Sequence, residues 1–308
     1  MAQSFAIRRR ERRNAGFGGQ WRTALIALLP AILVLGIFNV FPILYSGYLS
    51  FHDWNGFDPT PTYVGTQNYA DWFASAQFWH SLQVTLVYVS VMTALSVAFG
   101  LVVAMLLNTG IKGVTFYRVL YFVPVVTATV AAATVWRLLL DPGSGFINVA
   151  LRSIGISGPA WLSDPNWALL AVILVGVWKR VGFNMVIFLA GLQTIPRSLY
   201  EAAEVDGANN WQRFRFITLP MLAPTTVLVA ILSLIDAFLV FDTVFVMSNG
   251  SGGPVGSTEV MGFLLWREAF RYFNLGDASA IGWILFAIVL GITLIQWKFF
   301  GQSSGGRE

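Results

Sequence analysis

Six long apolar stretches set the strongest limit on how this chain can fold. An α-helix needs about 20 apolar residues to cross a hydrocarbon layer of about 30 Å, and each stretch is at least that long. Strands of a membrane β-barrel are only about 10 residues long and alternate apolar with polar positions, which excludes a barrel. We therefore expect an all-α polytopic membrane protein with six transmembrane helices. These cover 23–50, 81–108, 116–140, 167–193, 222–248 and 279–300.

The composition supports a membrane protein and argues against an enzyme. Of the 308 residues, 56% are hydrophobic and 11% charged, whereas soluble domains carry about 25% charged residues. The chain has no cysteine, which excludes disulfides, thiolate metal sites and a cysteine nucleophile. The two histidines, His52 and His80, lie near the ends of apolar stretches and are interpreted as interfacial polar residues, so no metal site is expected.

The distribution of lysine and arginine predicts the orientation in the membrane, because cytoplasmic loops carry an excess of both. Thirteen of the 19 fall on the side of the N-terminus, loop 109–115 with its flank, loop 194–221 and the tail, and four on the other side. The remaining two, Lys179 and Arg180, lie inside the fourth stretch. We expect a cytoplasmic basic N-terminus over 1–22, a six-helix domain over 23–300 and a cytoplasmic tail over 301–308. The first apolar stretch is too long for a signal peptide and is expected to be retained.

A polar insert over 196–220 interrupts the apolar pattern on the predicted cytoplasmic side. Pro196 suits the first turn of a helix, where its missing N–H is not needed. Gly207 permits a sharp reversal of the chain. A second helix can then start at Asn209 or Asn210, since asparagine is a good N-cap, and end at Pro220. The insert therefore predicts a cytoplasmic helix–turn–helix with a surface suited to bind another protein.

The spacing within this insert resembles the EAA loop of permease subunits of binding-protein-dependent ABC importers. The pattern E-A-A-x₃-G-x₉-I-x-L-P is met at every defined position, from Glu201 to Pro220. The flanking sequences "FLAGLQTIP" and "FDTVFVMSNGSGGPVGST" are similar to the carbohydrate-uptake branch, which includes maltose and glycerol-phosphate permeases. An extra Gly-Ser before "GGP" departs from the pattern and affects only the local loop.

The resemblance implies a division of labour between subunits. The EAA loop of the family forms a coupling helix that lies in a groove of a separate ATPase. The coupling residues carried over from the motif are Glu201, Ala202, Ala203, Asp206 and Gly207. None of the three lysines lies in a Walker A pattern, so ATP and Mg²⁺ are expected on the partner ATPase and no cofactor in this subunit.

The partners implied by the resemblance follow from the same division of labour. They are a second homologous permease subunit, two cytoplasmic ATPase subunits and an extracytoplasmic solute-binding protein. Membrane lipid surrounds the helices, and no nucleic acid is expected. The complex would lie in a bacterial or archaeal plasma (inner) membrane, with both termini of this chain in the cytoplasm.

Three charges fall close to the predicted bilayer midplane: Lys179, Arg180 and Asp236. A lipid-facing charge there costs at least ~2.5–3.5 kcal/mol, so these side chains should face a watery cavity or one another. A ring, small residues and hydrogen-bonding charges suit a sugar, and the family places its transport pocket between the corresponding helices. An ion pair of Asp236 with Arg180 or Lys179 that only joins the helices remains an alternative. The predicted solute-binding residues are Gly176, Lys179, Arg180, Phe183, Asp236, Ala237 and Val240.

Several alternatives stay open from sequence. The paired basic residues could serve a phosphorylated polyol such as glycerol phosphate instead of a mono-, di- or oligosaccharide. A secondary transporter or channel is less favoured, because neither an internal repeat nor a selectivity-filter signature is present. Loop 249–278 is expected to carry a short surface helix with an apolar stripe formed by Val260, Phe263, Leu264, Ala269 and Phe270.

Overall fold

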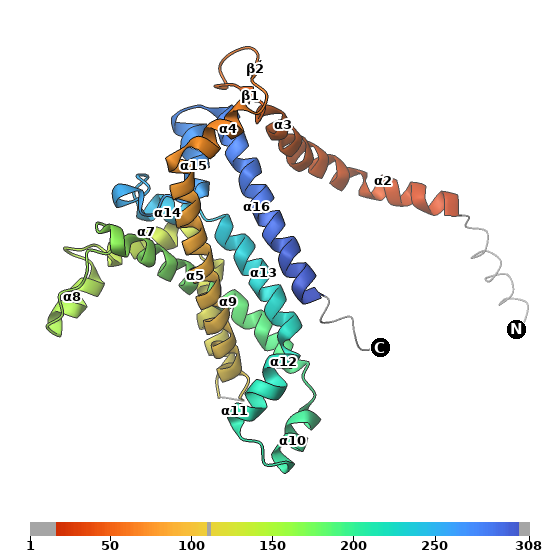
Figure 1. The fold of residues 1–308 in the computed structure, drawn as a ribbon. Coiled ribbons are helices and arrows are strands. Elements are labelled where there is room, and N and C mark those ends of the chain that lie inside the picture. Colours follow the sequence, from red (N-terminus) through yellow and green to blue (C-terminus); the bar gives the residue numbers. More distant parts are fainter. Residues whose placement is uncertain (1–16, 110–111, 302–308) are drawn as a thin grey trace, which may run out of the picture.

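The computed structural model describes residues 17–109 and 112–301 (Figure 1). These residues are mostly helical, with one antiparallel strand pair, β1 (His52–Asp53) and β2 (Thr62–Tyr63). The basic head at 8–13 and the tail beyond 301 lie outside the described residues. The main helices are α2 (Phe17–Leu35), α3 (Phe41–Leu49), α4 (Gln67–Ala74), α5 (Ala76–Leu107), α6 (Val114–Val126), α7 (Thr129–Leu139), α8 (Phe146–Ser153), α9 (Pro165–Gln193), α10 (Arg197–Val205), α11 (Asn210–Arg213), α12 (Leu219–Met221), α13 (Ala223–Phe238), α14 (Asp242–Met247), α15 (Met261–Trp266) and α16 (Leu275–Gly301).

Shorter helical segments join some of these helices. Three are π-helical: η1 (Gly36–Val40) joins α2 to α3, η2 (Phe214–Thr218) joins α11 to α12, and η4 (Arg267–Arg271) follows α15. A single 3₁₀ turn, η3, covers Pro254–Gly256.

Within the described residues, four helical stretches are long and apolar enough to cross a membrane, namely Ala24–Leu49, Ala76–Leu107, Pro165–Gln193 and Leu275–Gln296. Two bent pairs meet the same test when each is taken as one span. These are α6 with α7, bent by 99°, and α11–α12 with α13, bent by 66°. The six predicted spans therefore correspond to four straight helices and two broken ones.

The third span is broken where the sequence predicts a continuous helix over 116–140. Thr127 adopts an extended backbone conformation between α6 and α7. Its carbonyl accepts a hydrogen bond from Nζ of Lys179 at 2.7 Å. An unpaired carbonyl in a dry environment is costly, so the lysine satisfies the backbone group that the break frees.

The fifth span also differs from the predicted 222–248. Helix α13 ends at Phe238, and the chain leaves helical geometry at Phe241 before α14 begins. The Phe241 ring lies 5.8 Å from the ring of Trp266, so packing against α15 holds the chain in this shape. Both halves are apolar, so apolar run length gave no sign of the break.

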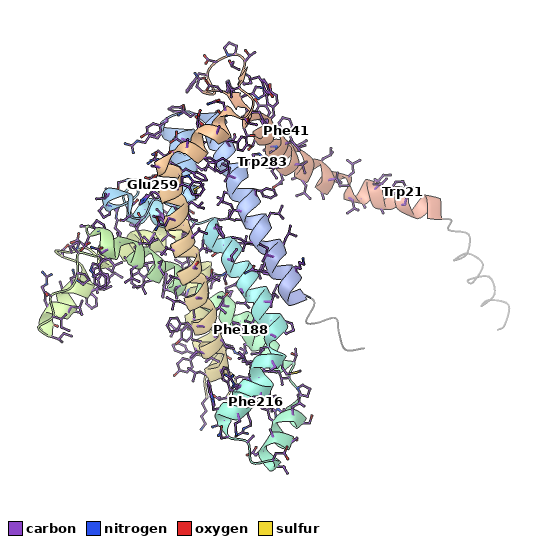
Figure 2. All side chains as sticks on the ribbon, in the orientation of Figure 1. Trp21, Phe41, Phe188, Phe216, Glu259 and Trp283 are labelled. Atoms are coloured by element: carbon purple, nitrogen blue, oxygen red, sulfur yellow. The ribbon has the colours of Figure 1, made fainter. Side chains whose placement is uncertain are left out.

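The core lies between α5 and α9, which pack along much of their length, with α6 and α13 beside them (Figure 1). Tyr88, Met185 and Phe188 are fully buried there, and Figure 2 shows Phe188 inside the bundle. Helix α9 starts where the sequence favours it, since the Asp164 side chain accepts the Asn166 N–H and Pro165 occupies the first turn.

The predicted surface helix in loop 249–278 is instead part of the core. Helix α15 packs against α5 and α16, and Val260, Phe263 and Leu264 are fully buried. Ala269 is buried as well, whereas Phe270 is 65% exposed and does not belong to the stripe. Four of the five predicted stripe residues thus share a buried apolar face, but the segment packs inside the protein and is not a surface helix.

The first helix stands apart from the bundle (Figure 1). No residue in its most apolar 18-residue window is buried, and Figure 2 shows Trp21 on it, away from the other helices. The span contacts the body near its end, in α3, where a Cβ on Gly47 would lie 3.0 Å from the Trp283 ring. His52, just beyond, is buried in the protein, and its Nδ1 lies 2.7 Å from the Tyr48 carbonyl oxygen.

Candidate functional site

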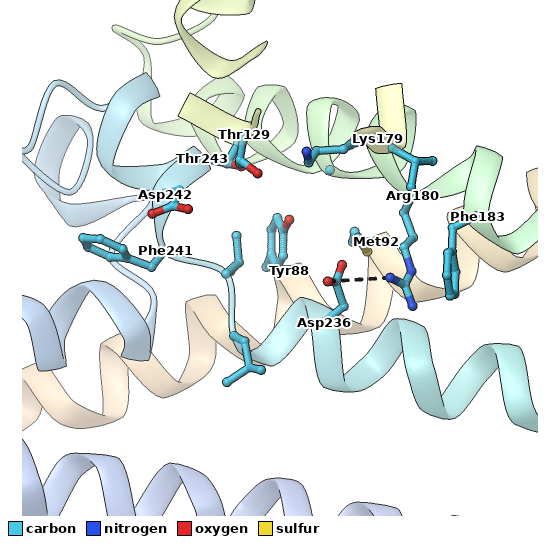
Figure 3. Close-up of a pocket in the computed structure, with 14 residues that line it drawn as sticks. Tyr88, Met92, Thr129, Lys179, Arg180, Phe183, Asp236, Phe241, Asp242 and Thr243 are labelled. Atoms are coloured by element: carbon cyan, nitrogen blue, oxygen red, sulfur yellow. Dashed lines mark ion pairs between the residues drawn. The ribbon is translucent and has the colours of Figure 1, made fainter. Parts of the chain in front are cut away.

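A cavity of about 410 Å³ lies near the middle of α9, beside the end of α13 (Figure 3). Small-molecule sites are typically about 300–1,000 Å³, so the volume suits a small solute. The structure brings six of the seven predicted solute-binding residues to its wall. They are Gly176, Lys179, Arg180, Phe183, Asp236 and Val240.

Ala237 is the exception, and its prediction as a lining residue is wrong. It is 1% exposed and packs inside the protein. Successive residues of an α-helix point about 100° apart, and at this position the rotation turns Ala237 into the protein while Asp236 faces the cavity. Val240 lies just beyond the end of α13, in the non-helical connection to α14, and lines the cavity.

Arg180 is held by contacts from three directions. Its Nη1 lies 3.6 Å from Asp236 Oδ1, and its guanidinium lies 4.4 Å from the centre of the Phe183 ring. Its Nε donates to Ser233 Oγ at 3.4 Å, and Ser233 donates to Asn184 Oδ1 at 3.0 Å. The ion pair considered from sequence is thus formed with Arg180. Because the Asp236 side chain is 54% exposed, the pair also faces the open cavity.

Lys179 has a different partner from its neighbour. Its ammonium group binds the Thr127 carbonyl at the break between α6 and α7, and the same break carries Val125 and Thr129 to the cavity wall. The two basic residues therefore differ in role. Arg180 joins α9 to α13, and Lys179 joins α9 to the broken third span.

Sequence reasoning missed the residues that other helices bring to this cavity. Among them are Tyr88 and Met92 from α5, Thr129 from α7, and Asp242 and Thr243 from α14. Tyr88 can approach because Gly176 has no side chain: a Cβ there would lie 2.5 Å from the Tyr88 hydroxyl oxygen. Only Asp242, a charge next to an apolar stretch, carried a signal that the sequence could have offered.

The charges on the cavity wall balance. Two cations, Lys179 and Arg180, face two carboxylates, Asp236 and Asp242 (Figure 3). The remaining polar groups include the hydroxyls of Tyr88, Thr129 and Thr243. Such a wall can donate and accept hydrogen bonds without a net charge, and the Phe183 ring adds apolar surface.

The helix–turn–helix predicted over 196–220 is present at one end of the molecule (Figure 1). Helix α10 directly follows Pro196, and Gly207 has a φ of +77°, which favours glycine. Asn209 begins the second helix through a capping box with Gln212. The hydroxyl oxygens of Tyr200 and Thr218 lie 2.9 Å apart and link the two helices.

The predicted coupling residues lie on the outer side of this helix pair. Glu201, Ala202, Asp206 and Gly207 are exposed, and Ala203 is half-buried. Nearby apolar side chains are also open, with Trp211 64% and Phe216 70% exposed (Figure 2). Their coupling role stays a prediction.

Broken membrane-spanning helices around a central polar cavity define a multi-pass helical permease. Residues 75–297 match the family described as "Binding-protein-dependent transport system inner membrane component", and the chain belongs to this family. The resemblance read from the EAA loop is thereby confirmed.

Named relatives align with most of this chain. The trehalose/maltose transport system permease protein MalF of Thermococcus litoralis is 36% identical over 276 residues, 89% of this chain and 92% of that protein. The sn-glycerol-3-phosphate transport system permease protein UgpA of Yersinia pestis is 32% identical over 287 residues, 92% of this chain and 95% of that protein. A chain from the crystal structure of a bacterial ABC transporter involved in import of the acidic polysaccharide alginate shares the fold, with a TM-score of 0.79, 23% identity, and coverage of 91% of this chain and 95% of that one.

Proposed function

We propose that this chain is the transmembrane subunit through which an ATP-driven importer passes a neutral saccharide. The charge balance of the central cavity carries this proposal. Lys179 and Arg180 are matched by Asp236 and Asp242, and Lys179 already donates to a backbone carbonyl. An uncharged, hydroxyl-rich solute can bind such a wall without leaving a buried charge unpaired.

A phosphorylated polyol is the second candidate, because UgpA is a glycerol-phosphate permease and 32% identical. A phosphate brings about −1.5 to −2 charges at neutral pH, which would call for an excess of free basic groups. Arg180 is paired with Asp236 and covered by the Phe183 ring. The geometry therefore favours the neutral solute over the anion.

Membership of this family suggests which other subunits complete the complex. An extracytoplasmic binding protein would deliver the solute, and a second homologous permease subunit would complete the path. Two ATPase subunits would bind ATP and Mg²⁺ and engage the helix pair around Glu201. Both termini would then lie in the cytoplasm of a bacterial or archaeal cell, which the lysine and arginine distribution supports.

The test uses the complete complex in proteoliposomes, with the binding protein added outside. ATP hydrolysis and uptake are measured with maltose, trehalose, lactose and glycerol 3-phosphate. We expect at least one of the sugars to stimulate both activities and glycerol 3-phosphate to stimulate neither. Stimulation by glycerol 3-phosphate alone would contradict the proposal.

A further inference from the structure

A second and larger cavity of about 560 Å³ lies beyond the first, between the end of α7, the start of α9 and the glycine-rich loop that follows α14. Its volume also falls within the range of about 300–1,000 Å³ that is typical of small-molecule sites. Its wall includes Arg137, Asp141, Ser163, Met247 and Asn249.

The charged groups of this cavity are fixed in place. Arg137 Nη1 donates to Asn249 Oδ1 at 2.7 Å and to the Val246 carbonyl at 3.3 Å. Asp141 Oδ1 accepts the backbone N–H of Ser144 at 2.8 Å and its hydroxyl at 2.9 Å. Together these hydrogen bonds hold the pKa of Asp141 below its ordinary value, and the one from the Ser144 backbone contributes most. One cation and one carboxylate thus give this wall no net charge.

The other lining groups alternate between hydroxyl-bearing and apolar side chains. Ser144, Ser163, Ser248 and Ser251 supply hydroxyls. Leu138, Leu162 and Met247 supply apolar surface between them. A saccharide presents the same mixture, because its hydroxyls need donors and acceptors while its C–H faces need apolar contact.

The two cavities lie along the same helices. Thr129 of α7 and Thr243 of α14 line the first cavity, whereas Arg137 and Met247 of these two helices line the second. Helices α7 and α14 pack against each other, so they run together from one cavity to the other. Eight residues separate Thr129 from Arg137, which is roughly 12 Å along a helix.

The path of helix α9 shows which cavity lies nearer the predicted coupling helices, α10 and α11. Ser163, just before α9, lines the second cavity, and Gly176, about 20 Å further along at 1.5 Å per residue, lines the first. Helix α9 then leads to α10 and the exposed Glu201. The second cavity is therefore the one further from the coupling helices.

We propose that this second cavity is an outer binding subsite for the saccharide, which the solute occupies before it reaches the cavity between α9 and α13. The inference rests on the proposed function, since it takes the solute to be a neutral sugar. A solute that moves between two weakly binding sites can leave each of them, as transport requires. The competing occupant is a loop of the binding protein, and the experiment separates the two.

The absence of natural cysteine allows a direct test by thiol labelling. Three single-cysteine variants are prepared in the complete complex without binding protein: Ser163→Cys in the outer cavity, Val240→Cys in the inner cavity and Ser157→Cys as control. Ser157 is exposed on the same connection before α9 but does not line the cavity. The probe is whichever of maltose, trehalose and lactose stimulates ATP hydrolysis in the assay above.

We expect the sugar to slow labelling of Ser163→Cys by N-ethylmaleimide several-fold and to leave Ser157→Cys unchanged. Protection of Val240→Cys alone would overturn the outer subsite while leaving the proposed function intact. If none of the three sugars stimulates the complex, the proposed function itself fails.

A bulky variant distinguishes a sugar subsite from a docking site for the binding protein. Ser163→Phe should lower sugar uptake while the complex still captures the binding protein, and Ser157→Phe should change neither. Loss of binding-protein capture in Ser163→Phe would assign the cavity to docking and overturn the inference.

Discussion

A buried ion pair joins Glu259 to Arg267, and the loss of the arginine alone should destabilise the permease strongly. The two side chains are 8% and 10% exposed, with Nη1–Oε2 and Nη2–Oε1 distances of 2.9 and 3.1 Å. Glu259 Oε1 also accepts hydrogen bonds from Gln77 and Ser81, each at 3.0 Å. The group therefore joins α15 and η4 to the start of α5, near the position of Glu259 in Figure 2.

Arg267→Met leaves the Glu259 carboxylate buried with only two neutral donors. Removing one partner of a buried pair costs about 3–5 kcal/mol. In a domain of 150–250 residues each kcal/mol shifts the melting temperature by about 2–4 °C, so we expect a loss of about 6 °C or more. The double variant Glu259→Gln/Arg267→Met should recover part of the loss, because the buried charge at position 259 is then removed and only Glu268, 3.9 Å from Arg267 Nε, has lost a cation.

The assay is thermal unfolding of the complete complex in detergent, followed by tryptophan fluorescence. Arg271→Met is the matched control, since Arg271 is exposed four residues further on and its loss should leave the melting temperature nearly unchanged. The reasoning is refuted if Arg267→Met melts together with Arg271→Met, or if the double variant is no more stable than the single one.

Three further predictions address other parts of the molecule. Glu201→Lys and Gly207→Val should leave the subunit inserted in the membrane but abolish solute-stimulated ATP hydrolysis. The first variant reverses a charge on the exposed coupling helix, and the second places a β-branched residue at a φ of +77°. Wild-type stimulation in both variants would contradict the coupling role. Single cysteines replacing Thr60 and Ser153 should react with an impermeant thiol reagent outside intact cells, and those replacing Thr109 and Ser198 should not; any reversed loop contradicts the six-span orientation. Burial raises the pKa of Glu268, so the folded state holds its proton to higher pH than the unfolded state. The melting temperature should therefore fall as pH rises above the ordinary glutamate pKa and level off above the raised one, and Glu268→Gln should flatten this dependence; an equal pH dependence in both proteins rules it out.

The span positions and the coupling helices could be predicted because local properties determine them. Apolar run length decides which segments enter a membrane, and Asp164 and Asn209 begin their helices through their own side chains. The break after Phe238 and the burial of α15 could not be predicted. The break is accompanied by packing of Phe241 against Trp266, and the burial of α15 depends on its packing against α5. Each of these contacts joins segments that are too far apart in the sequence for a local pattern to show them.

The charged residues of the candidate site could be predicted from sequence, whereas its uncharged residues could not. A charged side chain in a membrane helix has a high free-energy cost, so the sequence alone indicated that Arg180 and Asp236 share a site. Tyr88, Thr129 and Thr243 carry no charge and come from other helices, so nothing local marked them. The carbonyl partner of Lys179 depends on a helix break that the sequence did not predict.

The central claim is that solute passes through the cavity between α9 and α13, and the selectivity of uptake by Phe183→Ala tests it most directly. Phe183 lines the cavity and contacts the Arg180 guanidinium, but its replacement keeps both members of the Arg180–Asp236 pair that joins α9 to α13. The control is Phe286→Ala, on α16 and 55% exposed. Relative uptake rates for maltose, trehalose and lactose are measured in proteoliposomes containing the complete complex. The account predicts normal assembly and basal ATP hydrolysis in both variants, with sugar selectivity changed about tenfold, or about 1.4 kcal/mol, in Phe183→Ala only. Wild-type selectivity in Phe183→Ala would contradict it.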